Sequence, residues 1–365
     1  MKFSEIPGNL QIKNKLIRTV LDHRVSHAQL FFGPENSSKL ALAIAYAQFI
    51  NCTGKQAATP LAGDGAQGSF PGIDSCGVCP SCIKYQKLVH PDLHFIYPVA
   101  NTKKIPAKAQ SKHFVEDWRN FLLQNNCRAG LQQWYEAIGL DNKQGIINTA
   151  DCNEIITTLS YMSYESEYKV MILWMVEKLY HAAAPKILKI LEEPPDKTLF
   201  ILISGEPDQI IRTIVSRTLM VRIPDSGLPS NVDEEEDTSH LVTFRQWMRA
   251  CYEAKVPELI KFTGEISKAG REKQKRFLHY SLRTIAACAT WNYLRQMPAG
   301  ACNDETTFIG KFSPYIKPGN LVELNTLFND AIYHIERNAH AATLFMDLSL
   351  KLVPLIKPGF VAFGK

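Results

Sequence analysis

The sequence predicts an α/β protein in which a parallel sheet covered by helices is followed by an all-α region. Three observations lead to this fold class. Up to Pro224 the chain alternates short β-rich runs with helical patterns, the order of elements that builds a parallel sheet. The β-rich runs are nearly continuous in apolar residues, as strands buried on both faces are. From His240 onward, apolar residues recur at helical spacing.

Four runs are the predicted strands of the sheet. They cover residues 29–32, 93–99, 169–174 and 198–204, and the last run is the clearest because every residue but its ends is strongly apolar. Residues from about 100 to 145 interrupt the alternation with helical patterns that include Trp118 and Trp134. We therefore predict a helical insertion between the second and third strands.

A change of composition divides the chain. Residues 225–239 combine turn formers with the acidic run from Asp233 to Asp237, which predicts a solvated acidic linker. The first domain is expected over residues 1–224 and the all-α domain over residues 240–365.

The overall composition excludes several classes of protein. The chain has 365 residues, 45% of them hydrophobic, and a net charge of +5, which fits a globular protein and gives no strong electrostatic argument for nucleic acid binding. No apolar stretch approaches the roughly 18 residues of a membrane span, and the first residues lack the apolar core of a signal peptide. We expect a cytoplasmic protein without membrane partners.

The first predicted strand leads into a loop that resembles a phosphate-binding loop, G-x-x-x-x-G-K-[ST]. Gly33 and Lys39 are kept, but Ser38 stands where the second glycine belongs and Leu40 stands where a hydroxyl would hold magnesium. The pattern predicts that the fold of a nucleotide-binding domain is retained and that Gly33 and Lys39 belong to a vestigial site.

A second position supports this interpretation. An ATPase of this type needs an acidic pair at the end of a later strand, to hold magnesium and to activate water. Trp174 and Met175 occupy those places at the end of the 169–174 strand. Neither side chain can bind a metal or accept a proton, so we do not expect this chain to hydrolyse ATP.

Four of the nine cysteines have the spacing of metal ligands: Cys76, Cys79 and Cys82 follow C-x-x-C-x-x-C, and Cys52 lies upstream. Four thiolates close a tetrahedral zinc shell, which makes the predicted zinc structural. An iron–sulfur cluster of the bacterial type would need a cysteine at the position of Gln86. The remaining alternatives are reduced thiols without metal and replacement of one cysteine by His90 or His94.

Several short motifs, taken in order, carry a family resemblance. They are residues 3–8, residues 27–34, the four cysteines, residues 90–92, residues 188–195 and the pair Ser216 and Arg217. Together they cover most of residues 1–224, and this part of the chain resembles the delta-prime family of bacterial DNA polymerase III clamp-loader subunits, which are AAA+ proteins. The C-terminal part is similar in character, more weakly, to the family's collar domain.

The resemblance implies a subunit that does not hydrolyse ATP and that presents an arginine to the ATP of a neighbouring subunit. The family's Ser-Arg-Cys motif falls on Ser216 and Arg217, with Thr218 in place of the cysteine. It also implies an AAA+ module with a zinc insertion at about residues 52–82 and a collar for oligomerisation. The implied partners are the gamma/tau motor subunits, the delta subunit, the sliding clamp and primer–template DNA.

The sequence departs from the family in the length of the segment between Val99 and Ile146 and of the Gly-, Ala- and Pro-rich spacer between Cys52 and Cys76. The third departure is the small helical lid domain that usually follows the AAA+ core, which we expect to be reduced or absent because only the acidic linker at residues 225–239 stands in its place. Two alternatives stay open. One is an ATP-binding motor subunit of the gamma/tau kind, in which Lys39 still binds nucleotide. The other is a zinc-containing nucleic-acid-binding protein that works alone.

Overall fold

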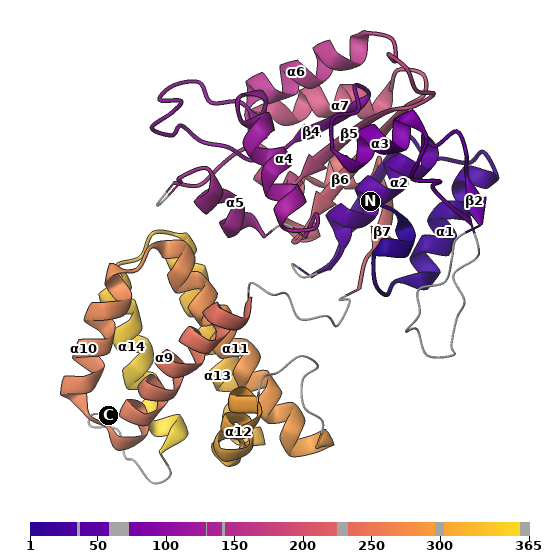
Figure 1. Ribbon diagram of the computed structural model, residues 1–365. Coiled ribbons are helices and arrows are strands. Elements are labelled where there is room, and N and C mark those ends of the chain that lie inside the picture. Colours follow the sequence, from indigo (N-terminus) through magenta and orange to yellow (C-terminus); the bar gives the residue numbers. More distant parts are fainter. Residues whose placement is uncertain are drawn as a thin grey trace. The chain divides into compact units, whose positions relative to one another are not determined.

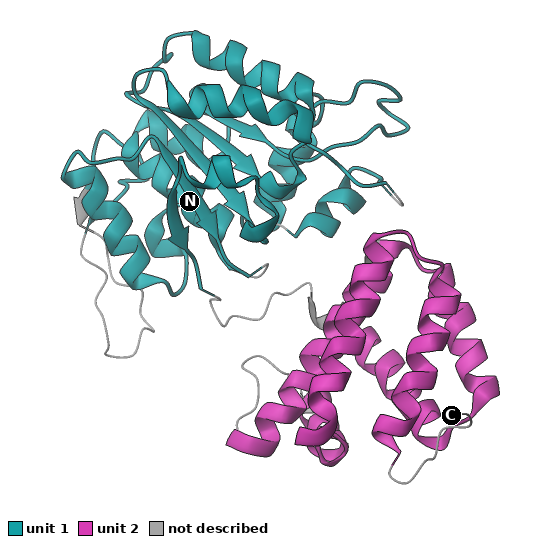
Figure 2. Cartoon of the chain, turned by 180° about the vertical axis from the view of Figure 1, so that it is seen from behind, with its two compact units in different colours: residues 1–226 teal, residues 227–365 magenta. Residues whose placement is uncertain are grey.

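The computed structural model describes residues 1–34, 37–57, 73–128, 130–140, 143–224, 233–295 and 303–357. The chain forms two compact units, Met1–Ser226 and Gly227–Lys365 (Figure 2). Most of the spacer between Cys52 and Cys76 and the first part of the predicted acidic linker, residues 225–232, lie outside the described residues.

Unit 1 alternates strands and helices as predicted. In chain order its elements are η1 (Phe3–Glu5), α1 (Leu10–Leu21), β1 (Ala28–Phe32), α2 (Lys39–Ile50), β2 (Gln56–Ala57), β3 (Ile73–Asp74), α3 (Pro80–Gln86), β4 (Leu93–Ile96), η2 (Ser111–Phe114), α4 (Val115–Gln124), α5 (Leu131–Ala137), α6 (Thr149–Ser160), β5 (Lys169–Trp174), η3 (Val176–Lys178), η4 (His181–Ala183), α7 (Ala184–Glu192), β6 (Thr198–Ser204), η5 (Pro207–Gln209), α8 (Arg212–Val215) and β7 (Leu219–Arg222).

Five of these strands form one sheet in the order β4-β5-β6-β1-β7, and every neighbouring pair is parallel. Figure 1 labels β4, β5, β6 and β7 of this sheet. β7 was not among the predicted strands, and β4 ends at Ile96 because Val99 instead forms an antiparallel bridge with Ile146. The short strands β2 and β3 pair separately and antiparallel, beside the cysteines. The predicted parallel α/β sheet is confirmed.

The alternation of side chains along the strands builds a core on each face of the sheet. On β5, Val170, Ile172 and Trp174 join the core that contains α2, whereas Met171 and Leu173 join the core that contains α6 and α7. This is the period of two that a strand imposes. α2 is buried along its whole length, as expected of a helix that is apolar all round.

The segment between β4 and α6 forms two short helices, α4 and α5, whose aromatic side chains pack onto the α2 face of the sheet. Trp118 of α4 lies 5.0 Å from Trp174 and 4.9 Å from Trp134, between ring centroids, and stacks on Tyr97 at 4.2 Å. The Trp134 indole donates to the carbonyl of Pro98 at 2.9 Å. This cluster joins the helical segment to the core of unit 1.

Unit 2 is helical, as predicted for the C-terminal region. Its elements are α9 (Asp233–Glu253), α10 (Val256–Lys268), α11 (Arg271–Leu294), α12 (Asn303–Phe312), η6 (Ser313–Tyr315), α13 (Pro318–Glu336) and α14 (Ala341–Ile356). Trp247 lies in the centre of its core, where its indole donates to Ser349 Oγ at 2.8 Å.

The structure differs from the sequence prediction at the start of this unit. α9 begins at Asp233, so the acidic run expected in a linker up to residue 239 forms the first turns of a helix. Carboxylates near a helix N-terminus are stabilised by the helix dipole, which favours helix rather than linker here.

The described helices include none with the length and apolarity needed to cross a membrane.

Candidate functional site

The described residues on either side of positions 35 and 36, in the loop after β1, bond to one another. A side chain at Gly33 would bring a Cβ atom to 2.0 Å from the carbonyl oxygen of Ile223, so only glycine fits beside this backbone. Lys39 is 5% exposed, and its ammonium donates to the carbonyl oxygens of Gly33, at 2.7 Å, and Pro34. The lysine that would meet a phosphate in a working loop is therefore bonded to the loop backbone.

The two positions expected to hold magnesium are buried and apolar. Leu40 is 4% exposed and Trp174 is 2% exposed, and both belong to the core that contains α2. Trp174 packs against Trp118 of α4. Neither offers an oxygen ligand, which agrees with a lost nucleotide chemistry, although the loss of ATP hydrolysis itself stays a prediction.

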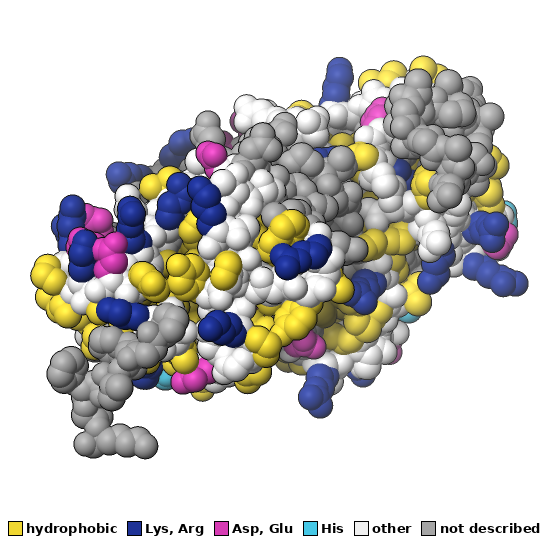
Figure 3. Space-filling view, turned by 90° about the horizontal axis from the view of Figure 1, so that it is seen from below, with side chains coloured by type: hydrophobic (Ala, Val, Ile, Leu, Met, Phe, Trp, Pro, Cys, Tyr) yellow, Lys and Arg dark blue, Asp and Glu magenta, His cyan; other side chains and the backbone are white. Residues whose placement is uncertain are grey.

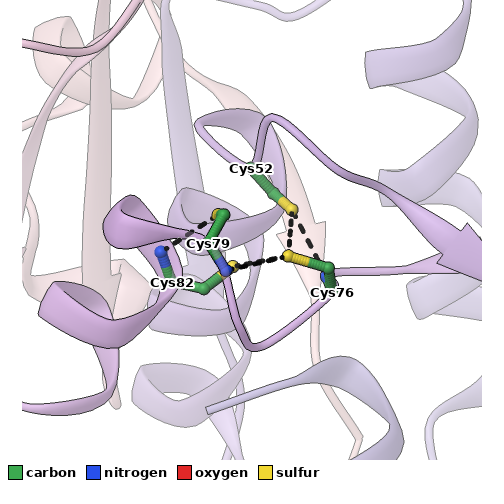
Figure 4. A group of neighbouring side chains, drawn as sticks. All are labelled: Cys52, Cys76, Cys79 and Cys82. Atoms are coloured by element: carbon green, nitrogen blue, oxygen red, sulfur yellow. Dashed lines mark hydrogen bonds between the residues drawn. The ribbon is translucent and has the colours of Figure 1, made fainter.

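The four cysteines of the predicted metal site converge, as Figure 4 shows. Their sulfur atoms all lie within 4.8 Å of one another. Cys76 Sγ is 3.6 Å from Cys52 Sγ and 3.9 Å from Cys82 Sγ. Zinc–sulfur bonds of about 2.3 Å in a tetrahedron separate the sulfurs by about 3.8 Å. The cluster has the dimensions to bind a metal such as zinc.

The local backbone holds the thiols in place. The N–H of Cys76 donates to Cys52 Sγ at 3.3 Å, the N–H of Cys79 donates to Cys76 Sγ at 3.3 Å, and the N–H of Cys82 donates to Cys79 Sγ at 3.4 Å. Cys79 is also the N-cap of α3, followed by Pro80 at the first helical position. Such donors orient metal ligands and tune their basicity.

The four thiols differ in how readily they lose a proton. Burial raises the pKa of Cys52 and of Cys82. Burial also acts to raise the pKa of Cys79, but the backbone N–H of Cys82 and hydrogen bonds with Thr53 outweigh it and lower the pKa to about 6. For Cys76, donors from Val78 and Cys79 likewise overcome burial and lower the pKa. A bound divalent metal would hold all four as thiolates.

Two histidines that sequence reasoning kept as alternative ligands lie outside this group of cysteines. His90 Nε2 is 3.1 Å from Glu165 Oε1, and the His90 ring packs on Tyr85. Gln86, at the position where an iron–sulfur motif needs a cysteine, donates to the carbonyl of Gly77 at 3.2 Å. Among the described residues, the candidate metal-binding group consists of the four cysteines.

Two further carboxylates accept hydrogen bonds from the backbone, and their contacts were not predicted from the sequence. Asp74 accepts the backbone N–H groups of Phe3 at 3.3 Å and Ser4 at 2.8 Å, so it ties the N-terminus to the cysteines. Asp92 accepts the N–H groups of residues 164, 165 and 166 at 2.6 to 3.0 Å and the hydroxyl of Ser166 at 2.9 Å. The 90–92 motif was a visible signal for Asp92, but its partners are far away in sequence.

Arg217 follows the short helix α8 and is partly exposed. Its guanidinium pairs with Glu192 Oε1 and donates to the carbonyl of Thr213 at 2.9 Å and to Ser216 Oγ at 3.4 Å. β7 begins at Leu219 and runs parallel to β1, with Gln29 opposite Leu219 and Phe32 opposite Arg222. Arg217 therefore lies at the amino end of the sheet, whereas Gly33 follows the carboxyl end of β1.

Three comparisons place the chain among known proteins. The family profile described as "DNA polymerase III, delta subunit" matches residues 8–226. Subunit delta' of DNA polymerase III from Bacillus subtilis is 26% identical over 207 residues, 57% of this chain and 45% of that protein. Subunit gamma/tau from Mycobacterium tuberculosis is 26% identical over 218 residues, 59% of this chain and 27% of that protein.

The matched part thus spans less than half the length of either relative. A solved structure of a DNA polymerase III gamma subunit-related protein from Thermotoga maritima aligns with a TM-score of 0.34 at 12% identity, over 94% of this chain and 99% of that chain. The family profile covers more than half of the present chain, so the chain belongs to the family of DNA polymerase III delta subunits.

Proposed function

We propose that this chain is a non-hydrolysing, delta-prime-like subunit of the DNA polymerase III clamp loader. In this role it assembles with gamma/tau motor subunits and a delta subunit, and the assembly loads the sliding clamp onto primer–template DNA in the cytoplasm. The chain contributes a rigid wall to the ring of subunits and supplies Arg217, beside Ser216, to the ATP of a neighbouring motor subunit.

The observation that carries this proposal is the separation of Arg217 from the loop of its own chain. Arg217 lies at the amino end of β7, and the loop that contains Gly33 and Lys39 follows the carboxyl end of the neighbouring strand β1. A strand advances by about 3.3 Å per residue, so the length of β1 separates the two positions. Arg217 therefore cannot serve the loop of its own chain and is suited to act on a second protomer.

The surface beside Arg217 supports a contact with another subunit. β7 is an edge strand of the sheet, and Leu219 and Met220 on it are each 43% exposed. Exposed apolar side chains on a sheet edge are typical of interaction surfaces. The backbone N–H and C=O groups of an edge strand can pair with another chain, and the apolar side chains can be buried in the same contact. An arginine at such an interface can stabilise the charge that develops on a transferred phosphoryl group.

The other parts of the chain fit this role. The bond of Lys39 to the loop backbone and the buried Leu40 and Trp174 agree with a subunit that does not turn over ATP. The cysteine cluster, with zinc bound, would supply rigidity rather than chemistry, since four thiolates leave no open coordination position. The helical unit is the proposed collar, joined directly to the AAA+ module with the lid reduced or absent.

A reconstituted clamp loader tests the proposal. Arg217→Ala is expected to lower DNA-stimulated ATP hydrolysis by about tenfold or more, given that arginines acting in trans contribute roughly 10³–10⁵ in well-studied cases. Arg212→Ala is the matched control, because Arg212 is an exposed arginine at the start of the same helix, α8. Equal rates for the Arg217→Ala variant and the unmodified loader would remove the proposed role of Arg217.

A second candidate function is an ATP-binding motor subunit of the gamma/tau kind. Lys39 is retained, and the hydroxyl of Ser38, buried at the N-terminus of α2, has no hydrogen-bond partner among the described residues. Helix N-termini favour anions. Calorimetric titration of the isolated chain with Mg-ATP separates the two candidates: binding in the micromolar range favours the motor subunit, and no detectable binding favours the delta-prime role.

A zinc protein that binds nucleic acid alone has less support. On the face drawn in Figure 3, the described Lys and Arg side chains are spread among hydrophobic and acidic ones rather than gathered in one dense patch. Phosphate recognition by an independent binder relies on such a patch. Tight, salt-sensitive DNA binding by the isolated chain would reverse this ranking.

A further inference from the structure

Glu192 holds the guanidinium of Arg217. Glu192 is the last residue of α7, and its carboxylate pairs with one terminal nitrogen of Arg217. The other terminal nitrogen donates to the carbonyl of Thr213 at 2.9 Å. The Arg217 side chain nevertheless stays 35% exposed, so the guanidinium is fixed by its own chain and still reachable from outside.

Hydrogen bonds and packing at the ends of α7 and α8 hold both residues of this ion pair in place. The carbonyl of Leu191 lies 3.1 Å from the His27 ring nitrogen, and α7 ends before Pro194, which cannot continue the helix. At the other partner, the hydroxyl of Ser216 donates to the carbonyl of Thr213 at 3.0 Å and closes the end of α8. α7 and α8 also pack on each other through the core beneath the sheet. The pair thus joins two anchored helix ends.

We propose that Glu192 is a positioning residue for Arg217 in the neighbour's ATP site, an inference that rests on the proposed function. An arginine has five N–H donors, and the contacts with Glu192 and Thr213 occupy only part of them. The remaining donors can meet a phosphoryl oxygen. A long side chain that is already held loses less rotational freedom when the phosphate arrives, and a well-oriented group contributes more to the rate than a freely rotating one.

The neighbouring residue supplies a matched control. Glu193 is the C-cap of α7 and is exposed, and the described contacts of Arg217 include Glu192 and not Glu193. Glu192→Gln and Glu193→Gln therefore remove the same charge from adjacent positions, and only the first removes the ion pair. Any effect of net charge at this edge is common to both variants.

The test uses the reconstituted clamp loader with clamp and primed DNA, and measures kcat and KM for ATP. Glu192→Gln is expected to lower kcat by about three- to tenfold with KM changed by less than about twofold, because loss of orientation acts on the reacting complex. Glu193→Gln is expected to leave both constants unchanged. In an Arg217→Ala background, Glu192→Gln is expected to have no further effect, because Glu192 acts only through Arg217.

The outcomes distinguish this inference from the proposed function. If Arg217→Ala lowers the rate and Glu192→Gln leaves it unchanged or raises it, the positioning role is wrong and the proposed function stands. A loss on Glu192→Gln that persists in the Arg217→Ala background also overturns the positioning role, since it would reflect folding or assembly. If Arg217→Ala has no effect, both the proposed role of Arg217 and the inference are wrong.

Discussion

The polar groups at the two ends of helix α2 differ in whether they can bind a ligand. At its N-terminal end, Lys39 donates to the carbonyl oxygens of Gly33 and Pro34. Just beyond its C-terminal end, Cys52 joins three other thiols whose sulfurs converge within 4.8 Å. The ammonium of Lys39 bonds to the backbone of its own loop. The four thiols have the geometry to bind one metal ion together. A sequence motif indicates a working site only where its polar atoms keep that capacity.

The largest expected effect is at the cysteine end. Cys76→Ser is expected to abolish stoichiometric zinc and to lower the free energy of unfolding by on the order of 5 kcal/mol, because metal binding contributes directly to folding. Metal analysis and urea unfolding check it. Cys288→Ala, which removes a buried thiol of α11 outside the cluster, is the control and is expected to keep its zinc. Unmodified protein without zinc would remove the contrast between the two ends.

The next largest effect on stability is expected at Trp174, the last residue of β5. Trp174→Asp restores the acidic residue type of a working ATPase, but it places a carboxylate in the cluster with Trp118. We expect it to lower the free energy of unfolding by about 4 kcal/mol or more, from lost aromatic burial and an unpaired charge, without any ATP hydrolysis. Trp174→Phe keeps the aromatic ring and is expected to cost less than half as much. A stable, hydrolysing Asp variant would show that the site is not vestigial.

Asp92 offers a third case, a carboxylate whose oxygens are bonded to its own chain. Burial acts to raise its pKa, but the N–H groups of residues 164 to 166 outweigh it and lower the pKa below the ordinary value of 3.8. The ionised carboxylate of Asp92 therefore stabilises the folded state fully above pH 3.8. This contribution to the free energy of unfolding is lost as the pH falls through the lowered pKa. Asp92→Asn is expected to cost about 2 kcal/mol at pH 7.

The difference between Asp92→Asn and the unmodified protein should shrink as the pH falls below that ordinary value, 3.8, measured by urea unfolding at several pH values. A difference that stays constant down to acidic pH would mean that the charge of Asp92 does not contribute, and that only its shape does.

The smallest expected effect is at Lys39. Lys39→Met keeps the aliphatic stem and removes the ammonium that bonds to the loop, so we expect a loss of about 1 kcal/mol in stability. Clamp loading by the reconstituted assembly is expected to change by less than about twofold, because this lysine binds no phosphate in the proposed role. A large loss of loading at unchanged stability would indicate nucleotide binding at this end of α2.

Much of unit 1 could be predicted from the sequence because its strands are buried on both faces. The runs at residues 169–174 and 198–204 coincide with β5 and β6, whose residues are all buried. β7 was missed because it has only four residues, and so short an apolar run cannot be told from a helix segment by its pattern. The start of α9 at Asp233 was also missed, because a run of carboxylates has the composition of a linker and becomes helical only at a helix N-terminus.

The spacing of residues in the sequence predicted part of the candidate site, whereas contacts between residues far apart in the sequence could not be predicted. The spacing of Cys76, Cys79 and Cys82 predicted a cluster that the structure brings together with Cys52. The contact between Glu192 and Arg217 could not be predicted, because it depends on the packing of α7 and α8. Spacing in sequence specifies ligands on one turn or helix, whereas ion pairs between elements depend on the tertiary fold.

The packing of Trp174 against Trp118 has a consequence for substitutions at the end of β5. Helix α4 presents an indole to this place, and the two rings belong to one core. Contacting residues are energetically coupled, so a substitution of Trp174 alone leaves a misfit with Trp118. We expect a polar side chain to be accommodated at this place only together with a compensating replacement on α4.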